Sequence, residues 1–337
     1  MKHCLHTTIL ILVASVVIIS AKCQNAKLNI GINLCGAEFG NKNLPGVINQ
    51  DYIYPTEKEV QYFFNKGFKL IVLPFKWERI QHLPGGDLDS LELFEIRQFI
   101  SRCNKYNVQV TLTMQNFAAY QKENKELLLG SHHLSFAHYK DVWKKIATAL
   151  LDQKNMYGFD IMNEPRKIFD KAWFNAAQNA IDGIREVDTL TNIIIDGENS
   201  SFAFDWKFDN TKLKDLKDPY DKIIYDAHCY FDFDHSGRYD TKYKRKVDPN
   251  MGVASVQPFV EWLKKYNKKG MIGEFGIPAS DSRWLVVMDN FLDYINKNGI
   301  SANYWAAGPW WKDYELSIQP VDGKDRPQMQ VLEKYLK

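Results

Sequence analysis

Residues 56–73 read TEKEVQYFFNKGFKLIVL, which is one amphipathic helix followed directly by one short apolar strand. The opening TEKE has the spacing of a capping box, in which two side chains satisfy backbone N–H groups at the start of a helix. Lys66-Gly67 is typical of a helix end, because glycine readily adopts the left-handed conformation there and a cation complements the helix dipole. The apolar run 69–73 then predicts a buried strand.

The same alternation recurs along the chain, and Lys269-Gly270 and Asn298-Gly299 repeat the helix-end signal before later strands. The predicted strands are 28–33, 69–73, 108–113, 157–162, 192–195, 223–227, 271–273 and 301–305. Besides the helix that starts at Thr56, the predicted helices are 89–106, 135–153, 170–187, 253–267 and 282–298.

Alternating strands and helices favour a parallel sheet. Eight such units in one chain predict a single-domain (β/α)8 barrel, the TIM barrel. The alternative is a doubly wound open sheet, which a phosphate-binding glycine loop would favour. The chain has neither the GxGxxG nor the GxxxxGK[ST] spacing, so the barrel is the better prediction.

The composition is that of a globular protein. The 337 residues are 45% hydrophobic and 25% charged, and 43 Lys+Arg against 41 Asp+Glu leave a formal charge of +2. This balance excludes a disordered chain and gives no support for nucleic acid as a partner. Aromatic residues are abundant, at 14%.

The N-terminus predicts export. Lys2 is followed by the uncharged run ILILVASVVII at 9–19 and by small residues at 20 and 21. This order is typical of a secretory signal peptide, and the run is shorter than the roughly 20 residues that span a bilayer. We therefore expect a signal peptide at 1–22 and a secreted domain at 23–337, with no membrane span after cleavage.

The cysteines left after cleavage are scattered. They are Cys23, Cys35, Cys103 and Cys229, and none of them forms a CxxC pair. At most two disulfides can form, and buried free thiols are an equal alternative. Nothing in the spacing predicts a metal site.

Two carboxylates come at the ends of predicted strands. Glu164 follows the fourth strand and Glu274 follows the seventh. In a TIM barrel the carboxyl ends of the strands form one active-site face. Glycoside hydrolysis requires such a pair: one carboxyl protonates the leaving oxygen, and the other attacks the anomeric carbon or activates water.

The residues around both glutamates resemble glycoside hydrolase family 5, the cellulase family. NEP at 163–165 and GEFG at 273–276 resemble its acid/base and nucleophile motifs. The stretches 31–40, 74–79, 228–237 and 304–311 resemble its first, second, sixth and eighth strands, and 316–320 the segment that follows. Together they are similar to the endo-β-1,4-glucanase branch of the family.

The resemblance implies roles for individual residues. Glu164 would be the acid/base and Glu274 the nucleophile of a retaining double displacement, in which the two carboxyl groups lie about 5–5.5 Å apart. His228 would contact the acid/base, and Tyr230 would donate a hydrogen bond to the nucleophile.

It also implies a substrate site for a β-glucan polysaccharide or oligosaccharide. Asn163 would bind the sugar 2-hydroxyl, Trp305 would lie under the sugar at the cleavage point, and Asn116 and Trp310 would add substrate contacts. No cofactor and no metal is expected, and we expect a monomer.

The sequence departs from the family at two positions. Val72 stands where the second strand usually carries an arginine, and Gln115 stands where the third strand usually ends in histidine. Losing a cation near Glu274 would raise its pKa and weaken its preorganisation. A weakened enzyme or a carbohydrate-binding pseudoenzyme is therefore an open alternative. A hydrolase of another β-glycan, such as mannan or mixed-linkage glucan, is a second one.

Overall fold

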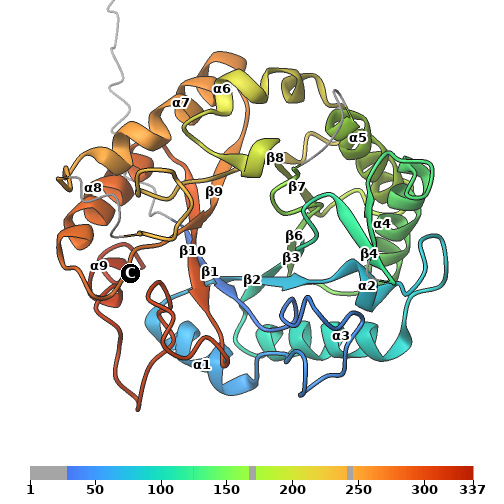
Figure 1. Ribbon diagram of the computed structural model, residues 1–337, viewed down its shortest axis with the longest axis horizontal. Coiled ribbons are helices and arrows are strands. Elements are labelled where there is room, and N and C mark those ends of the chain that lie inside the picture. The colour runs from blue at the N-terminus through green and yellow to red at the C-terminus, as the bar shows by residue number, and fades with distance from the viewer. Residues whose placement is uncertain (1–28, 124, 167–171, 241–245, 337) are drawn as a thin grey trace, which may run out of the picture.

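A closed ring of parallel strands forms the centre of the molecule, with helices around it (Figure 1). The computed structural model describes residues 29–123, 125–166, 172–240 and 246–336. Around the barrel the strand order is β1, β2, β3, β6, β7, β8, β9 and β10, and β10 pairs again with β1. The predicted (β/α)8 barrel is confirmed. The predicted signal peptide at 1–22 and Cys23 lie outside the described residues.

The barrel strands are β1 (Ile30–Leu34), β2 (Leu70–Phe75), β3 (Gln109–Met114), β6 (Met156–Asp160), β7 (Asn192–Asp196), β8 (Ile223–His228), β9 (Gly270–Phe275) and β10 (Ser301–Ala307). The longer helices are α1 (Glu57–Lys66), α3 (Ser90–Asn104), α4 (Phe136–Leu150), α5 (Ala172–Arg185), α7 (Met251–Tyr266) and α8 (Arg283–Lys297). Every predicted strand and helix therefore has a counterpart, with ends shifted by a few residues.

The local signals at the ends of α1 and α8 act as expected. Thr56 and Glu59 form the capping box of α1, and Gly67 closes that helix in the left-handed conformation with φ 104°. Gly299 follows α8 with φ 69°. The prediction that Lys269-Gly270 marks a helix end is wrong, because α7 already ends at Asn267, which has the left-handed conformation.

Gly270 is instead the first residue of β9. A Cβ on it would lie 2.5 Å from a methyl carbon of Leu263 and 2.9 Å from the Phe259 ring. The glycine is therefore needed for close packing between α7 and the sheet, and not for a helix end.

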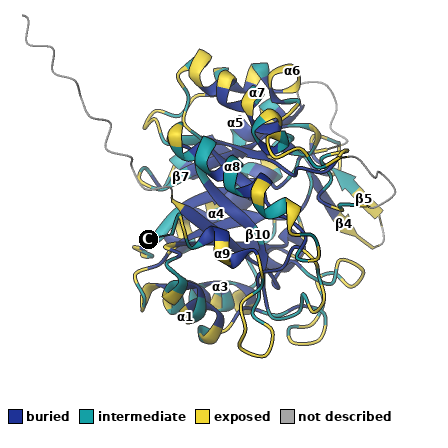
Figure 2. Ribbon diagram, turned by 90° about the vertical axis from the view of Figure 1, so that its left-hand side faces the viewer, coloured by how far each residue is buried: buried dark blue, intermediate teal, exposed yellow. Residues whose placement is uncertain are grey.

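The strands and the inner faces of the helices form one buried core, which is dark blue in Figure 2. Trp77, Trp143, Trp173 and Trp206 are fully buried within it. Most of the aromatic excess thus serves the packing of a large barrel.

Several short elements were not predicted. β4 (Ala119–Lys122) and β5 (Lys125–Leu128) form an antiparallel hairpin after β3, and it projects at one edge of the molecule in Figure 2. The others are α2 (Trp77–Ile80), η1 (Asn199–Ser201), α6 (Trp206–Asp209), η2 (Thr211–Asp215) and α9 (Met329–Leu332).

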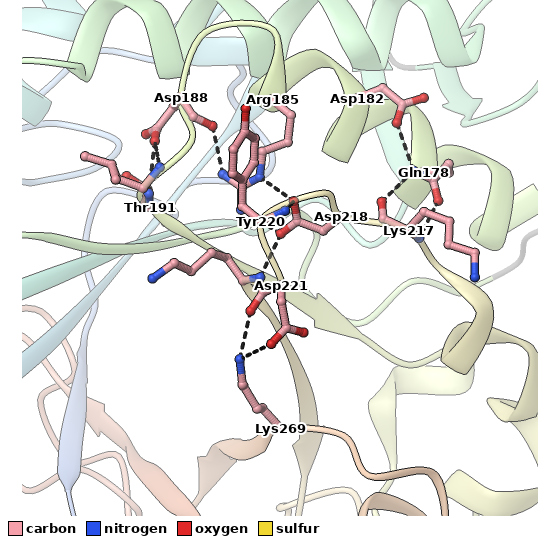
Figure 3. Close-up of polar contacts among 12 residues, drawn as sticks. Gln178, Asp182, Arg185, Asp188, Thr191, Lys217, Asp218, Tyr220, Asp221 and Lys269 are labelled. Carbon is pink, nitrogen blue, oxygen red and sulfur yellow. Dashed lines mark hydrogen bonds and ion pairs between the residues drawn. The ribbon is translucent and has the colours of Figure 1, made fainter.

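The amino end of the barrel carries a polar network (Figure 3). Arg185 binds both carboxylate oxygens of Asp218, at 2.8 and 2.9 Å, with both side chains almost fully buried. The Asp188 side chain accepts backbone N–H bonds from Leu190 and Thr191. These contacts join the loops that lead into β7 and β8.

Cys35, Cys103 and Cys229 are free and buried, so the three described cysteines form no disulfide. None of the described helices has both the length and the apolar character that a bilayer span requires.

Candidate active site

Glu164 lies beyond the end of β6, at the carboxyl end of the barrel. Its backbone has φ 44°, a left-handed conformation that is uncommon for a residue with a side chain and that concentrates at functional sites. The backbone N–H donates a 2.8 Å hydrogen bond to Oδ2 of Asp196 at the end of β7. Asp196 therefore holds the turn that directs the Glu164 side chain toward the barrel axis.

His228 ends β8 and lies between the two glutamates. Its Nδ1 is 3.0 Å from Oε1 of Glu164 and 3.5 Å from Oε2 of Glu274, and its Nε2 is 3.5 Å from Oδ2 of Asp196. Burial alone would lower the pKa of His228, but the charges of Glu274, Asp196 and Glu164 outweigh it and raise the pKa well above its usual value. The imidazole of His228 thus lies within ion-pair distance of all three acidic groups.

Glu274 lies within β9, in register with His228 on β8. Its Oε2 accepts a 2.6 Å hydrogen bond from the Tyr230 hydroxyl. Burial raises the pKa of Glu274 to about 7, with the Glu164 charge adding to the rise, while His228 and the Tyr230 hydrogen bond oppose it. The Tyr230 ring packs against Gly237, where a Cβ would lie 2.7 Å from it.

The two predicted catalytic carboxylates are brought together. One oxygen of Glu164, one oxygen of Glu274 and a ring nitrogen of His228 all lie within 4.8 Å of one another. All four residues that were predicted as catalytic or supporting therefore meet in one cluster.

The predicted substrate residues divide into two groups. Asn163 is buried beside Glu164, and its amide nitrogen has no hydrogen-bond partner among the described residues. Asn116, in contrast, uses its amide oxygen to accept from Trp77 N and its amide nitrogen to donate to Glu78, each at 2.8 Å. Asn116 thus braces the wall of a 310 Å³ pocket that it shares with Lys76 and Arg166.

Trp305 is half-buried on β10 and belongs to an aromatic cluster. Its indole N–H donates to the Tyr314 hydroxyl at 3.2 Å. The Trp311 ring lies 6.0 Å from Trp305 and stacks on Tyr314 at 4.4 Å. Trp310, the residue that was predicted, is also half-buried. The described ring contact to Trp305 comes from Trp311, a neighbour that the prediction did not include.

Sequence reasoning also missed a set of buried carboxylates close to Glu164 and Glu274. They are Asp160 on β6, Asp196 on β7 and Asp226 on β8. Burial raises the pKa of Asp160 to about 7, and burial together with the neighbouring carboxylates raises the pKa of Asp196 and Asp226. An aspartate inside an otherwise apolar strand was the available signal, because ionisable residues are rarely fully buried without a role.

Two groups of side chains could attract a cation at this end of the barrel. The first is Glu164, His228 and Glu274, and the second is Asp196, Asp226 and His228, each with its ligating atoms within 4.8 Å. In the first group, His228 itself supplies the positive charge, because it forms ion pairs with both glutamates.

The comparisons with known proteins identify the family of the chain. Residues 32–310 match the family model Cellulase (glycosyl hydrolase family 5). The chain is 32% identical to endo-beta-1,4-glucanase B of Emericella nidulans over 87% of this chain and 86% of that protein. It is 33% identical to probable endo-beta-1,4-glucanase B of Aspergillus oryzae, over 91% and 90%.

A solved structure is similar over the same region. The crystal structure of Pseudomonas stutzeri endoglucanase Cel5A in complex with cellobiose superposes with a TM-score of 0.88 and 40% identity, covering 91% of this chain and 92% of that one. The family match spans the barrel, and the sequence relatives span nearly the whole chain. The protein is therefore a glycoside hydrolase that belongs to the cellulase family, glycosyl hydrolase family 5.

Proposed function

We propose that the chain is a secreted, monomeric endo-β-1,4-glucanase that cleaves internal bonds of cellulose-like glucans with retention of configuration. The observation that carries this proposal is the placement of a Glu164 and a Glu274 carboxylate oxygen within 4.8 Å of each other. A retaining mechanism uses carboxyl groups about 5–5.5 Å apart, whereas inversion requires about 6.5–9.5 Å. The relatives described above are endo-beta-1,4-glucanases, which supports the choice of substrate.

In the first step Glu164 donates its proton to the glycosidic oxygen while Glu274 attacks the anomeric carbon. The bond to the leaving sugar breaks, and a glycosyl ester forms on Glu274. In the second step Glu164 takes a proton from water, and the water oxygen displaces Glu274 from the same carbon. Both steps pass through an oxocarbenium-like transition state.

The neighbouring residues orient these groups. The Tyr230 hydroxyl holds one oxygen of Glu274, which leaves the other oxygen for attack. His228 lies within ion-pair distance of both carboxylates and offsets their repulsion. The free amide of Asn163 suits a sugar hydroxyl, and Trp305 with Trp311 offers an apolar surface to the sugar ring.

Removing either carboxyl tests the assignment. Glu164→Gln and Glu274→Gln should each lower reducing-end release from carboxymethyl cellulose by at least about 10³-fold, because each abolishes a bond-making or proton-transfer role. Glu186→Gln, a surface glutamate paired with Lys140 and Lys144, is the matched control and should retain full activity. Wild-type turnover in both catalytic variants would refute the mechanism.

A second candidate is a sugar-binding protein with little turnover, which Val72 and Gln115 favour. A panel of cellulose, mannan and mixed-linkage glucan on the wild-type protein separates the possibilities. We expect the fastest release from β-1,4-glucan. Binding of cello-oligosaccharides without product, followed by recovery of activity in the Val72→Arg, Gln115→His double variant, would favour the second candidate instead.

Export and the monomeric state are tested apart from catalysis. Expressed from its own first residue, the protein should be recovered outside the cell with an N-terminus near Cys23. Light scattering on that material should give the mass of one chain, and a larger mass would contradict the monomer.

A further inference from the structure

The interior of the barrel below Glu274 contains a small polar cavity. The cavity has a volume of about 10 Å³, which is room for about one water molecule. TIM-barrel interiors are normally filled by branched apolar side chains. Here the cavity is lined mainly by polar side chains, and His228 of the candidate site is one of them. The others include Asn33, Thr111, Asp160, Asn163, Asp226, Glu274 and Asn303.

Several oxygens around this cavity have no partner. The Thr111 hydroxyl, Oδ1 of Asn303 and Oδ1 of Asp160 are buried and accept no hydrogen bond within the described part of the chain. All three residues are at least nine-tenths buried, with exposed fractions of 1%, 2% and 5%. Buried polar groups nearly always find a partner, so these oxygens point to an occupant of the cavity.

The charge around the cavity favours a cation as the occupant. Asp160, Asp226 and Glu274 line it, and Asp196 lies next to Asp226 with ligating atoms within 4.8 Å. Among the described residues, His228 is the one cationic side chain that forms ion pairs with any of these four carboxyl groups. Val72 forms an apolar part of the wall and contributes no charge. Burial raises the pKa of all four carboxyl groups, so without a counter-charge they tend to keep their protons. A cation in the cavity would let them ionise, because a buried charge is stable only when an opposite charge is near.

We propose that this cavity binds one small, hard monovalent cation with the size and charge of Na⁺. Hydroxyl, amide and carboxylate oxygens are the ligands that hard cations prefer. Mg²⁺ usually keeps several of its waters, and a cavity of this size has no room for them. The ion would stabilise the carboxylates below the catalytic pair. Only its effect on Glu274 as nucleophile rests on the proposed function, because binding itself does not require catalysis.

The experiment measures binding through stability. The mature wild-type protein is unfolded thermally in 100 mM NaCl and in 100 mM choline chloride, with EDTA in both buffers. We expect Tm to be higher in sodium by about 2–4 °C, because an ion that binds only the folded state stabilises it. The ²³Na resonance should broaden on addition of the protein and sharpen when the protein is unfolded.

Variants localise the effect. Val72→Arg places a guanidinium in the cavity wall and should abolish both the sodium shift in Tm and the ²³Na broadening. Asp160→Asn should reduce them, and Thr111→Val gives the same test if the aspartate variant does not fold. Asp221→Asn, which removes an exposed acid at the other end of the barrel, is the matched control and should keep the full shift.

Equal Tm values of the wild type in the two salts, with no ²³Na broadening, would overturn the proposal and leave water as the occupant. A sodium shift that persists unchanged in Val72→Arg would overturn it as well. Either result would leave the glucanase assignment intact, because no activity is measured.

Discussion

The two ends of the barrel treat buried acids in opposite ways. At the amino end, Asp218 is bound by Arg185 through two parallel hydrogen bonds (Figure 3). Burial alone would raise the pKa of Asp218, but Arg185 and the backbone N–H groups outweigh it and lower the pKa. At the carboxyl end, burial raises the pKa of Asp160 and of Glu274 to about 7.

This difference in pKa indicates that the buried acids have different roles at the two ends: stability at the amino end and catalysis at the carboxyl end. A buried acid with a bidentate cation is fully compensated, so it fixes the loops around it. A buried acid that shares one histidine with other acids has a raised pKa, and groups with such shifted pKa values are frequent at sites where protons are exchanged. Residues of the amino end should therefore affect unfolding, whereas residues of the carboxyl end should affect turnover.

The largest effect on stability is expected for Arg185→Met. It leaves Asp218 buried without its cation, which should lower the free energy of unfolding by about 3 kcal/mol. Chemical denaturation gives this value, and kcat at 25 °C should not change because the pair lies at the far end of the barrel. A lower kcat in this variant, with unaltered stability, would contradict the view that residues of the amino end affect unfolding and not turnover.

Tyr230→Phe should have the converse effect. Losing the hydrogen bond to Glu274 should lower kcat by about 10–100-fold, the range for one bond to a charged group, while Tm is retained. Steady-state kinetics and a thermal scan measure both quantities. Tyr335→Phe makes the same substitution at a tyrosine that binds Asp289, and it should leave kcat unaltered.

A smaller effect is a shift in pH dependence. The proposed mechanism requires Glu274 to be ionised, and its pKa is raised to about 7. We therefore expect activity to fall as the pH drops through about 7. Val72→Arg brings a cation near and should move this acid limb of kcat/KM down by at least about one pH unit. Val72→Leu fills the same space without charge and should leave the limb in place. An equal shift in both variants would show that charge is not the cause.

The smallest effect is expected for Lys269→Gln. Lys269 pairs with Asp221 at 2.8 Å, but both side chains are exposed at the amino end. Exposed ion pairs contribute little to stability, so both Tm and kcat should match the wild type. A clear loss of Tm would mean that the whole amino-end network acts cooperatively and not through its buried pair alone.

Local signals explain why the fold could be predicted from the sequence. The cap at Thr56 and the apolar runs are each encoded within a few residues, so the alternation of strands and helices could be predicted from the sequence. Gly270 was misassigned because its role depends on Leu263 and Phe259, which pack on it from α7. The β4–β5 hairpin was missed because its strands are short and carry exposed charged residues, such as Lys122 and Lys125.

The pair of glutamates could be predicted from their positions at strand ends, whereas the roles of His228 and Tyr230 were implied only by the resemblance to the family. Glu164, Glu274, His228 and Tyr230 stand at strand ends, and they meet as expected. The cavity below them could not be predicted, because its lining comes from strands far apart in the chain and each residue alone is unremarkable.

The tryptophans have a practical consequence. Trp77, Trp143, Trp173 and Trp206 are sealed inside the barrel wall, whereas Trp305, Trp310 and Trp311 are partly open to solvent at the carboxyl end. Trp262 is buried like the first group, and Trp284 is partly exposed like the second. The fluorescence should therefore divide into two populations. Emission from the sealed group will shift to longer wavelength only on unfolding, and emission from the open group should respond to a sugar bound against these rings. One unlabelled sample can thus report folding and ligand occupancy in the same spectrum.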